Sequence, residues 1–156
     1  MKLINAQTLA QTLMQQNELE GWTFHFDRAK RRFGACNYTT KTISLSRHLT
    51  QLNSAAQVRE TLLHEIAHAL TPGAHHGEAW QRACKQLGID PKRTYSSAQV
   101  EQPAPRYWLV CKSCNLKVPR NRRSRKTFAC KRCCDEKNGG NYSKKYALHF
   151  ELYSAD

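Results

Sequence analysis

The run LLHEIAHAL at residues 62–70 constrains this chain more than any other stretch. It carries the pattern H-E-x-x-H among apolar, helix-favouring residues. On an α-helix, His64 and His68 lie on one face about one turn apart, so both imidazoles can bind one metal ion. Glu65 is rotated to the flank of that face, where its carboxylate can reach a water on the ion. The run therefore predicts a hydrolytic zinc site.

Signals around this run predict a helix independently. Ser54 is a good N-cap and Gln57 follows three residues later, which makes a capping box, while Pro72 and Gly73 end the segment. The apolar residues that recur at helical spacing are Val58, Leu62, Ile66 and Ala69. The alternative is a core helix with two incidental His residues. The metal site is favoured because a His pair has little reason to face a core, and because Glu65 has the offset that the chemistry uses.

A third ligand is expected soon after the helix. His75 and His76 follow the turn at residues 71–74, where the chain must double back, so either imidazole can reach the first pair. Adjacent residues rarely point alike, so one should bind, and Glu78 is a weaker rival. Three neutral imidazoles would leave the zinc its full charge to lower the pKa of a bound water to about 7.

The second half of the chain contains two cysteine pairs. The spacing Cys111-x-x-Cys114, fifteen residues, Cys130-x-x-Cys133 is typical of a four-thiolate zinc ribbon, in which each pair lies on a tight turn. Cys134 could replace Cys133 as the fourth ligand. Such a site is structural and closed, and about 50 residues bury too little core to fold without it. A disulfide framework is disfavoured in a chain that has no secretory signal.

Positive charge is concentrated in the same half. The formal net charge of the chain is +13, and residues 105–156 hold thirteen Lys or Arg against four Asp or Glu. Basic residues that neutralise phosphates and rings that stack on bases are typical of single-stranded nucleic-acid binding. Alternatively, the basic loop serves only to keep the protein soluble, and the aromatic rings form a small hydrophobic core. The candidate contacts are Arg120, Arg122, Arg123, Arg125, Lys126 and Trp108.

The remaining patterns predict an α+β protein with a core at residues 1–104 and a basic zinc ribbon at residues 105–156. A helix is expected from Ala6 to Leu19, and a linker at residues 96–105. Alternating residues predict strands at residues 22–26, 33–38 and 42–46, which we expect to pair as one antiparallel sheet in the core. The same pattern predicts strands in the ribbon at residues 107–110, 116–119, 127–129 and 146–153.

The motifs together resemble the SprT-like family of zinc metallopeptidases. H-E-x-x-H is followed by His76-Gly77-x-x-Trp80, then by Leu-Gly-Ile at residues 87–89 and Arg-Thr at residues 93–94. The similarity covers about residues 42–95, with a looser match to a C-terminal zinc ribbon. The resemblance implies a small zincin-like core, His76 as the third ligand with His75 outside, and DNA-dependent proteolysis of proteins crosslinked to DNA.

We therefore expect a zinc metalloendopeptidase with one catalytic and one structural zinc, in which Glu65 is the general base. Its expected partners are DNA, single-stranded or at a junction with duplex, and DNA-bound protein substrates. Tyr38 and Tyr95 remain open as donors to the oxyanion. One alternative is a regulator that binds nucleic acid and in which both zinc ions are structural. Another is a hydrolase acting on something other than protein.

No apolar run approaches the length of a membrane span, and the N-terminus turns polar too soon for a signal peptide. The expectation is a monomer in the cytoplasm, associated with the nucleoid if the source is bacterial.

Overall fold

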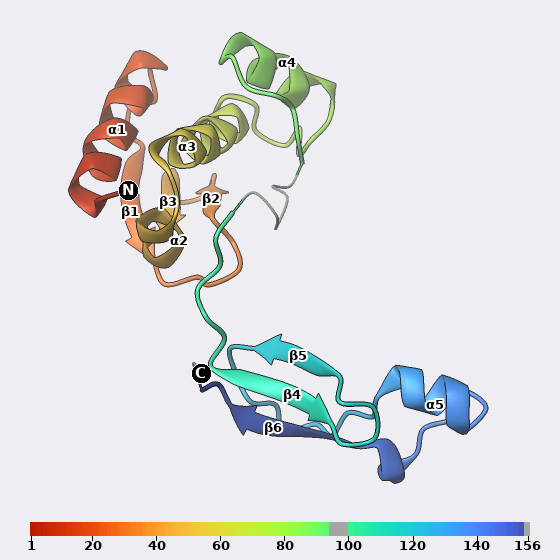
Figure 1. Ribbon diagram of the computed structural model, residues 1–156. Helices are drawn as coiled ribbons and strands as arrows, with labels where there is room; N and C mark the ends of the chain where they lie inside the picture. The colour runs from red at the N-terminus through yellow and green to blue at the C-terminus, as the bar shows by residue number, and fades with distance from the viewer. Residues whose placement is uncertain (94–99, 155–156) are drawn as a thin grey trace. The chain divides into compact units, whose positions relative to one another are not determined.

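The computed structural model describes residues 1–93 and 100–154. The chain divides into two compact units, Met1–Pro103 and Ala104–Asp156. No helix in the described ranges is long and apolar enough to cross a membrane. The elements of the first unit are α1 (Leu3–Gln16), β1 (Thr23–Asp27), β2 (Gly34–Asn37), β3 (Thr42–Ser46), α2 (Arg47–Leu52), α3 (Ala55–Leu70) and α4 (Glu78–Gln86) (Figure 1).

The sheet of the first unit is mixed. Its strand order is β1-β3-β2, with β1 parallel to β3 and β2 antiparallel to β3. The prediction of an antiparallel sheet is therefore wrong, although its three strands were placed correctly to within two residues. Alternation of apolar and polar residues identifies strands but not their partners. Here β3 lies between β1 and β2, so two strands that are consecutive in sequence are not neighbours in the sheet. As a result β2 is an edge strand, and α3 packs against it.

The capping box predicted for α3 is confirmed. Ser54 Oγ accepts a hydrogen bond from the Gln57 N–H at 3.3 Å, and the Gln57 side chain accepts one from the Ser54 N–H at 2.9 Å. The predicted apolar face is also confirmed, because Val58, Leu62 and Ile66 are all completely buried. Burial of this stripe against α1 and the sheet fixes the rotation of α3 and leaves the His64 side facing a cavity.

Part of the predicted linker belongs to the first unit. Val100 is 5% exposed, and the Asn53 side chain donates to the Glu101 carbonyl at 3.0 Å and accepts from the Glu101 N–H at 2.8 Å. The linker prediction is therefore wrong at these two positions. A single apolar residue in a polar stretch gave no signal that it packs into the core. Residues 96–99 of the predicted linker lie outside the described residues.

The second unit has an antiparallel sheet of order β5-β4-β6. Its elements are β4 (Tyr107–Cys111), β5 (Lys117–Arg120), α5 (Lys131–Lys137), the short 3-10 helix η1 (Lys144–Tyr146) and β6 (Leu148–Leu152) (Figure 1). The prediction of a strand at residues 127–129 is wrong, because only an isolated β-bridge between Ala129 and Ala147 forms there. The strand predicted from Tyr146 begins two residues later, because Tyr146 lies in η1.

Candidate active site and metal centres

Three imidazoles converge in the first unit. His64 and His68 come from α3, and His76 comes from the turn before α4. Ring nitrogens of the three residues lie within 4.8 Å of one another, and the Nε2 atoms of His68 and His76 are 3.2 Å apart. A tetrahedral zinc with bonds of about 2.0–2.1 Å to nitrogen separates its nitrogen ligands by about 3.4 Å. The three residues therefore fit a zinc ion.

The turn after α3 determines which of His75 and His76 lies beside His64 and His68. Thr71 Oγ1 donates to the Ala67 carbonyl at 2.7 Å, and the Gly77 N–H donates to the Ala74 carbonyl at 2.8 Å, so the chain folds back over α3. His75 has a positive φ of 48° and is exposed, and the group of converging ligands in the described residues does not include it. His76 is thus placed as the resemblance implies.

Glu78, the weaker candidate for the third ligand, does not belong to the converging group in the described residues. Glu78 is exposed and lies 3.7 Å from the Arg82 guanidinium, which is one turn further along α4.

Trp80 supports all three imidazoles, a role that sequence reasoning missed. Its completely buried ring lies 4.9 Å from the ring of His64, 5.2 Å from that of His68 and 4.6 Å from that of His76, centre to centre. The ring stacks on His68 with an interplanar angle of 25°. The aromatic position of the family motif was the available signal, and its packing against the His rings holds their orientation.

Burial keeps these imidazoles neutral. Burial, together with the smaller effects of the neighbouring His68 and His76, lowers the pKa of His64 to about 4. Burial and the neighbouring histidines lower the pKa of His68 to about 4 as well, and the pKa of His76 is lowered chiefly by burial. A neutral imidazole has a free lone pair, so at pH 7 the three side chains are in the form that binds a metal ion.

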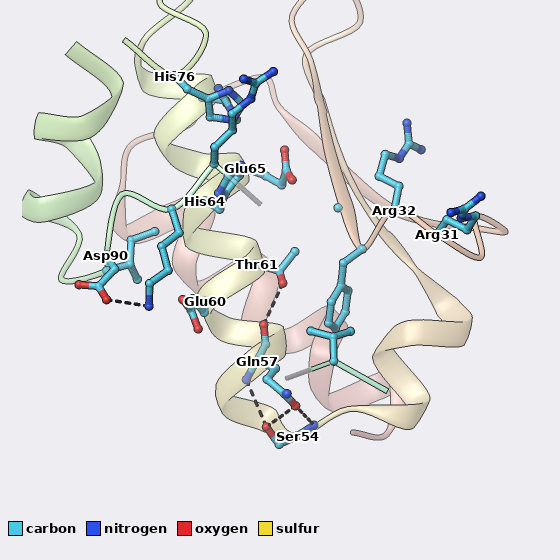
Figure 2. A pocket seen from close by; sticks show the side chains of 17 residues that line it. Arg31, Arg32, Ser54, Gln57, Glu60, Thr61, His64, Glu65, His76 and Asp90 are labelled. Carbon is cyan, nitrogen blue, oxygen red and sulfur yellow. Dashed lines mark hydrogen bonds and ion pairs between the residues drawn. The ribbon is translucent and has the colours of Figure 1, made fainter. Parts of the chain in front are cut away.

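Glu65 lies beside this group, between α3 and β2. The residue is 7% exposed, and burial raises the pKa of its carboxyl to about 7, against the opposing effect of Arg32. A carboxyl whose pKa lies near the working pH can both accept and return a proton. Figure 2 shows Glu65 next to His64 and His76 at one end of a cavity, with Ser54 and Gln57 at the other.

The cavity has a volume of about 770 Å³ and runs along the exposed side of α3. Arg31 and Arg32, from the basic segment between β1 and β2, line it (Figure 2). The Arg32 guanidinium is held 2.6 Å from the Asp27 carboxylate. This segment is therefore part of the cavity wall. Further lining residues are Phe33, Gly34, Glu60, Thr61, His68, Ile89, Asp90, Lys92, Arg93 and Val100.

Of the two candidate oxyanion donors, Tyr38 follows β2 and is 39% exposed. Burial raises the pKa of its phenol, and nearby Cys36 and Glu65 add to the effect. Tyr95 lies outside the described residues.

The four predicted ribbon cysteines converge in the second unit. The sulfurs of Cys111 and Cys133 are 3.8 Å apart and those of Cys114 and Cys130 are 3.6 Å apart. Tetrahedral zinc with bonds of about 2.3 Å to sulfur separates its thiolates by about 3.8 Å, whereas a disulfide is about 2.05 Å long. All of these cysteines are free, so the residues fit a closed zinc site.

One detail of the cysteine group differs from the prediction, whereas the choice of Cys133 over its alternative Cys134 agrees with it. Cys134 does not belong to the converging group in the described residues, although it is 5% exposed and next to Cys133. The second pair does not lie on a simple turn, because Cys130 caps α5 and Cys133 lies in its first turn. Helical geometry turns adjacent side chains by about 100°, which separates Cys133 from Cys134.

The predicted nucleic-acid contacts are divided between the two faces of the second sheet. Tyr107 pairs with Arg120 in register and Trp108 pairs with Pro119, so Tyr107 and Trp108 point to opposite faces. Trp108 packs on Tyr153, with ring centres 5.9 Å apart. Arg122, Arg125 and Lys126 are exposed in the segment after β5.

The face with Tyr107 contains an arginine over two rings. The guanidinium carbon of Arg123 lies 5.6 Å from the centre of Tyr107 and 6.0 Å from that of Phe150, and these two rings meet edge to face at 6.1 Å. Phe150 was missed by sequence reasoning. Its signal was the alternation of β6, which places Phe150 opposite Leu109 and on the Tyr107 face.

Among the comparisons with known proteins, the match to a family model agrees with the resemblance. No curated protein shows a significant match to the chain. The crystal structure of the metallopeptidase zymogen of Pyrococcus abyssi abylysin is similar at 16% identity and a TM-score of 0.46, over 53% of this chain and 78% of that one. The model of the SprT-like family matches residues 5–100, which is more than half of the sequence. The chain therefore belongs to the SprT-like family, a zinc metallopeptidase-like family.

Proposed function

We propose that this protein is a zinc-dependent endopeptidase that cleaves proteins bound or crosslinked to DNA. The observation that carries the proposal is the convergence of His64, His68 and His76 on the wall of a cavity, beside a buried Glu65 whose pKa is raised to about 7. Neutral nitrogen donors and a proton acceptor next to open space are the elements of metal-assisted hydrolysis.

In this proposal the three imidazoles hold the catalytic ion. When bound there, zinc would polarise the scissile carbonyl and make a water more acidic. A carboxylate oxygen of Glu65 takes a proton from the attacking water as the new C–O bond forms. The same oxygen gives that proton to the leaving amine nitrogen as the C–N bond breaks, so Glu65 ends the cycle as it began.

The cavity and the outer edge of β2, which pairs with no second strand among the described residues, suit an extended peptide. Since β2 is the edge strand next to α3, its outer backbone groups can pair with a substrate strand. Backbone pairing selects weakly by side chain, which suits an enzyme whose substrates share only their attachment to DNA.

The second unit supplies the proposed attachment to nucleic acid. A structural zinc would be held by Cys111, Cys114, Cys130 and Cys133 and would order this small unit. Residues 105–156 carry thirteen Lys or Arg against four Asp or Glu, which is an excess of positive charge. Arg123 over Tyr107 and Phe150 presents a planar cation on an aromatic face, which favours phosphates and unpaired bases. Binding both DNA and the protein on it raises the effective concentration of substrate at the active site.

The test is a cleavage assay with zinc-loaded full-length protein and a basic DNA-binding protein as substrate, with and without single-stranded DNA. A chelator serves as control, and mass spectrometry identifies the products. The proposal predicts new peptide termini that depend on zinc and increase with DNA. Zinc-loaded protein that binds DNA but produces no termini would instead indicate a regulator with two structural metals. Release of a non-peptide product would indicate another hydrolase.

A further inference from the structure

The slot that holds the Glu65 carboxylate is made by a missing side chain. Gly34 begins β2 and is buried against α3. A Cβ placed on Gly34 would lie 2.7 Å from Glu65 Oε1, 2.8 Å from Glu65 Cγ and 2.9 Å from Thr61 Cγ2. Contacts of that length do not occur between such atoms, so a side chain at this position and the present Glu65 conformation exclude each other.

The backbone itself does not call for glycine here. Gly34 lies in a regular strand opposite Leu45, and it is not among the glycines with positive φ. Any L-residue could adopt this conformation, and glycine weakens a strand interior. The reason for glycine is therefore the space that the side chains of Glu65 and Thr61 occupy.

The slot also limits where the carboxylate can go. Glu65 belongs to α3, and Thr61 lies one turn earlier on the same helix, with its hydroxyl bonded to the Gln57 carbonyl at 2.9 Å. The Thr61 methyl group and the Gly34 backbone thus form two walls around the Glu65 side chain. Displacement from these walls moves the carboxylate away from its position beside His64.

We propose that Gly34 is a positioning residue, whose lack of a side chain creates the slot that places the Glu65 carboxylate beside the three imidazoles. The geometric part stands on the contacts at Gly34. The catalytic part rests on the proposed peptidase function.

A double-mutant cycle on stability tests the slot without any assay of activity. In zinc-loaded protein, Gly34→Ala should lower the thermal midpoint by several degrees. Thr61→Ser, which removes the methyl group 2.9 Å from the new Cβ and keeps the hydroxyl, is present in both backgrounds of the cycle, so Glu65→Ala then removes the remaining short contacts and Gly34→Ala should cost much less. If Gly34→Ala fails to fold alone but folds with Glu65→Ala, the slot is supported. An equal cost in both backgrounds would overturn it.

Kinetics on a peptide substrate test the catalytic part. Gly34→Ala should lower kcat at least about tenfold, with KM and zinc content unchanged, because only the proton acceptor moves. Thr23→Ser, at the exposed start of β1 and outside the cavity lining, is the control and should retain wild-type kcat. Undiminished kcat in Gly34→Ala would overturn the positioning role. Failure of the wild type to cleave peptides would refute the peptidase proposal instead, and the stability cycle would still decide the slot.

Discussion

The Nε2 atoms of His68 and His76 lie 3.2 Å apart, although His68 lies in the last turn of α3 and His76 lies in the turn before α4. Two neutral imidazoles can share one hydrogen bond at this distance, but a hydrogen bond between His68 and His76 does not explain why the ring of His64 also lies beside them. All three nitrogens within 4.8 Å of one another fit a common ion. The turn between α3 and α4 is thus the element that completes the site.

Removal of the third imidazole should empty this site alone. His76→Ala should lower zinc from about two ions per chain to about one, because two remaining ligands bind zinc too weakly to retain it during purification. Elemental analysis of the purified protein measures this. His75→Ala is the matched control, since His75 is exposed and outside the group, and should keep about two ions. Loss of zinc from the His75 variant would contradict the assignment.

The neighbouring cysteines of α5 should differ in the same way. Cys133→Ser should release the structural zinc and unfold the second unit, because this small unit depends on its metal. Cys134→Ser should retain the ion, since the Cys134 sulfur lies outside the group of four. Zinc content and limited proteolysis of residues 104–156 report both outcomes. Equal zinc loss in the two variants would show that either thiolate can complete the site.

Zinc binding by the imidazoles should depend little on pH near neutrality. Three imidazoles with ordinary pKa values of about 6.5 would each fall from about three quarters to about one quarter neutral between pH 7 and pH 6, a combined loss of about thirtyfold in affinity. Burial lowers the pKa of His64 and His68 to about 4 and also lowers that of His76. Protons therefore compete only in stronger acid, and we expect a change of less than about threefold over this interval.

Competition with a chelator of known proton affinity measures this dependence, with the cysteine site kept saturated. A thirtyfold loss between pH 7 and pH 6 would contradict the neutral state assigned to the buried imidazoles.

Arg123 should contribute both charge and planarity to nucleic-acid binding. Arg123→Ala should weaken binding of single-stranded DNA and reduce the slope of log affinity against log salt by about 0.7, the share of one phosphate. Arg123→Lys keeps the charge and should keep the slope, yet it should lose affinity because an ammonium does not stack between bases and rings. Lys85→Ala on α4 is the control for charge alone. Unchanged affinity in both Arg123 variants would remove this face from the interface.

Local signals in the sequence were sufficient for much of the site. Ser54 and Gln57 fixed the start of α3, and the apolar stripe fixed its rotation, so the facing of His64 and His68 followed from helix geometry alone. Cysteine spacing likewise predicted which thiols converge, because tight turns and helix starts act over a few residues.

Contacts between distant segments could not be predicted in this way. The parallel pairing of β1 with β3 depends on where a loop carries the chain, which alternation does not encode. Gly34 gave no signal as a wall for Glu65, because the contact joins residues far apart in sequence. Trp108 was grouped with the arginines by proximity along the chain, whereas strand alternation places it on the other face from Tyr107.

We propose that Glu65 moves the proton for peptide hydrolysis at the histidine site. The most direct measurement is cleavage of a DNA-bound protein by zinc-loaded Glu65→Gln beside the wild type, with zinc content determined on the same samples. We predict that the variant keeps its zinc and its DNA affinity while kcat falls by at least about a hundredfold. Undiminished cleavage by the zinc-loaded Glu65→Gln protein would exclude Glu65 as the residue that moves the proton.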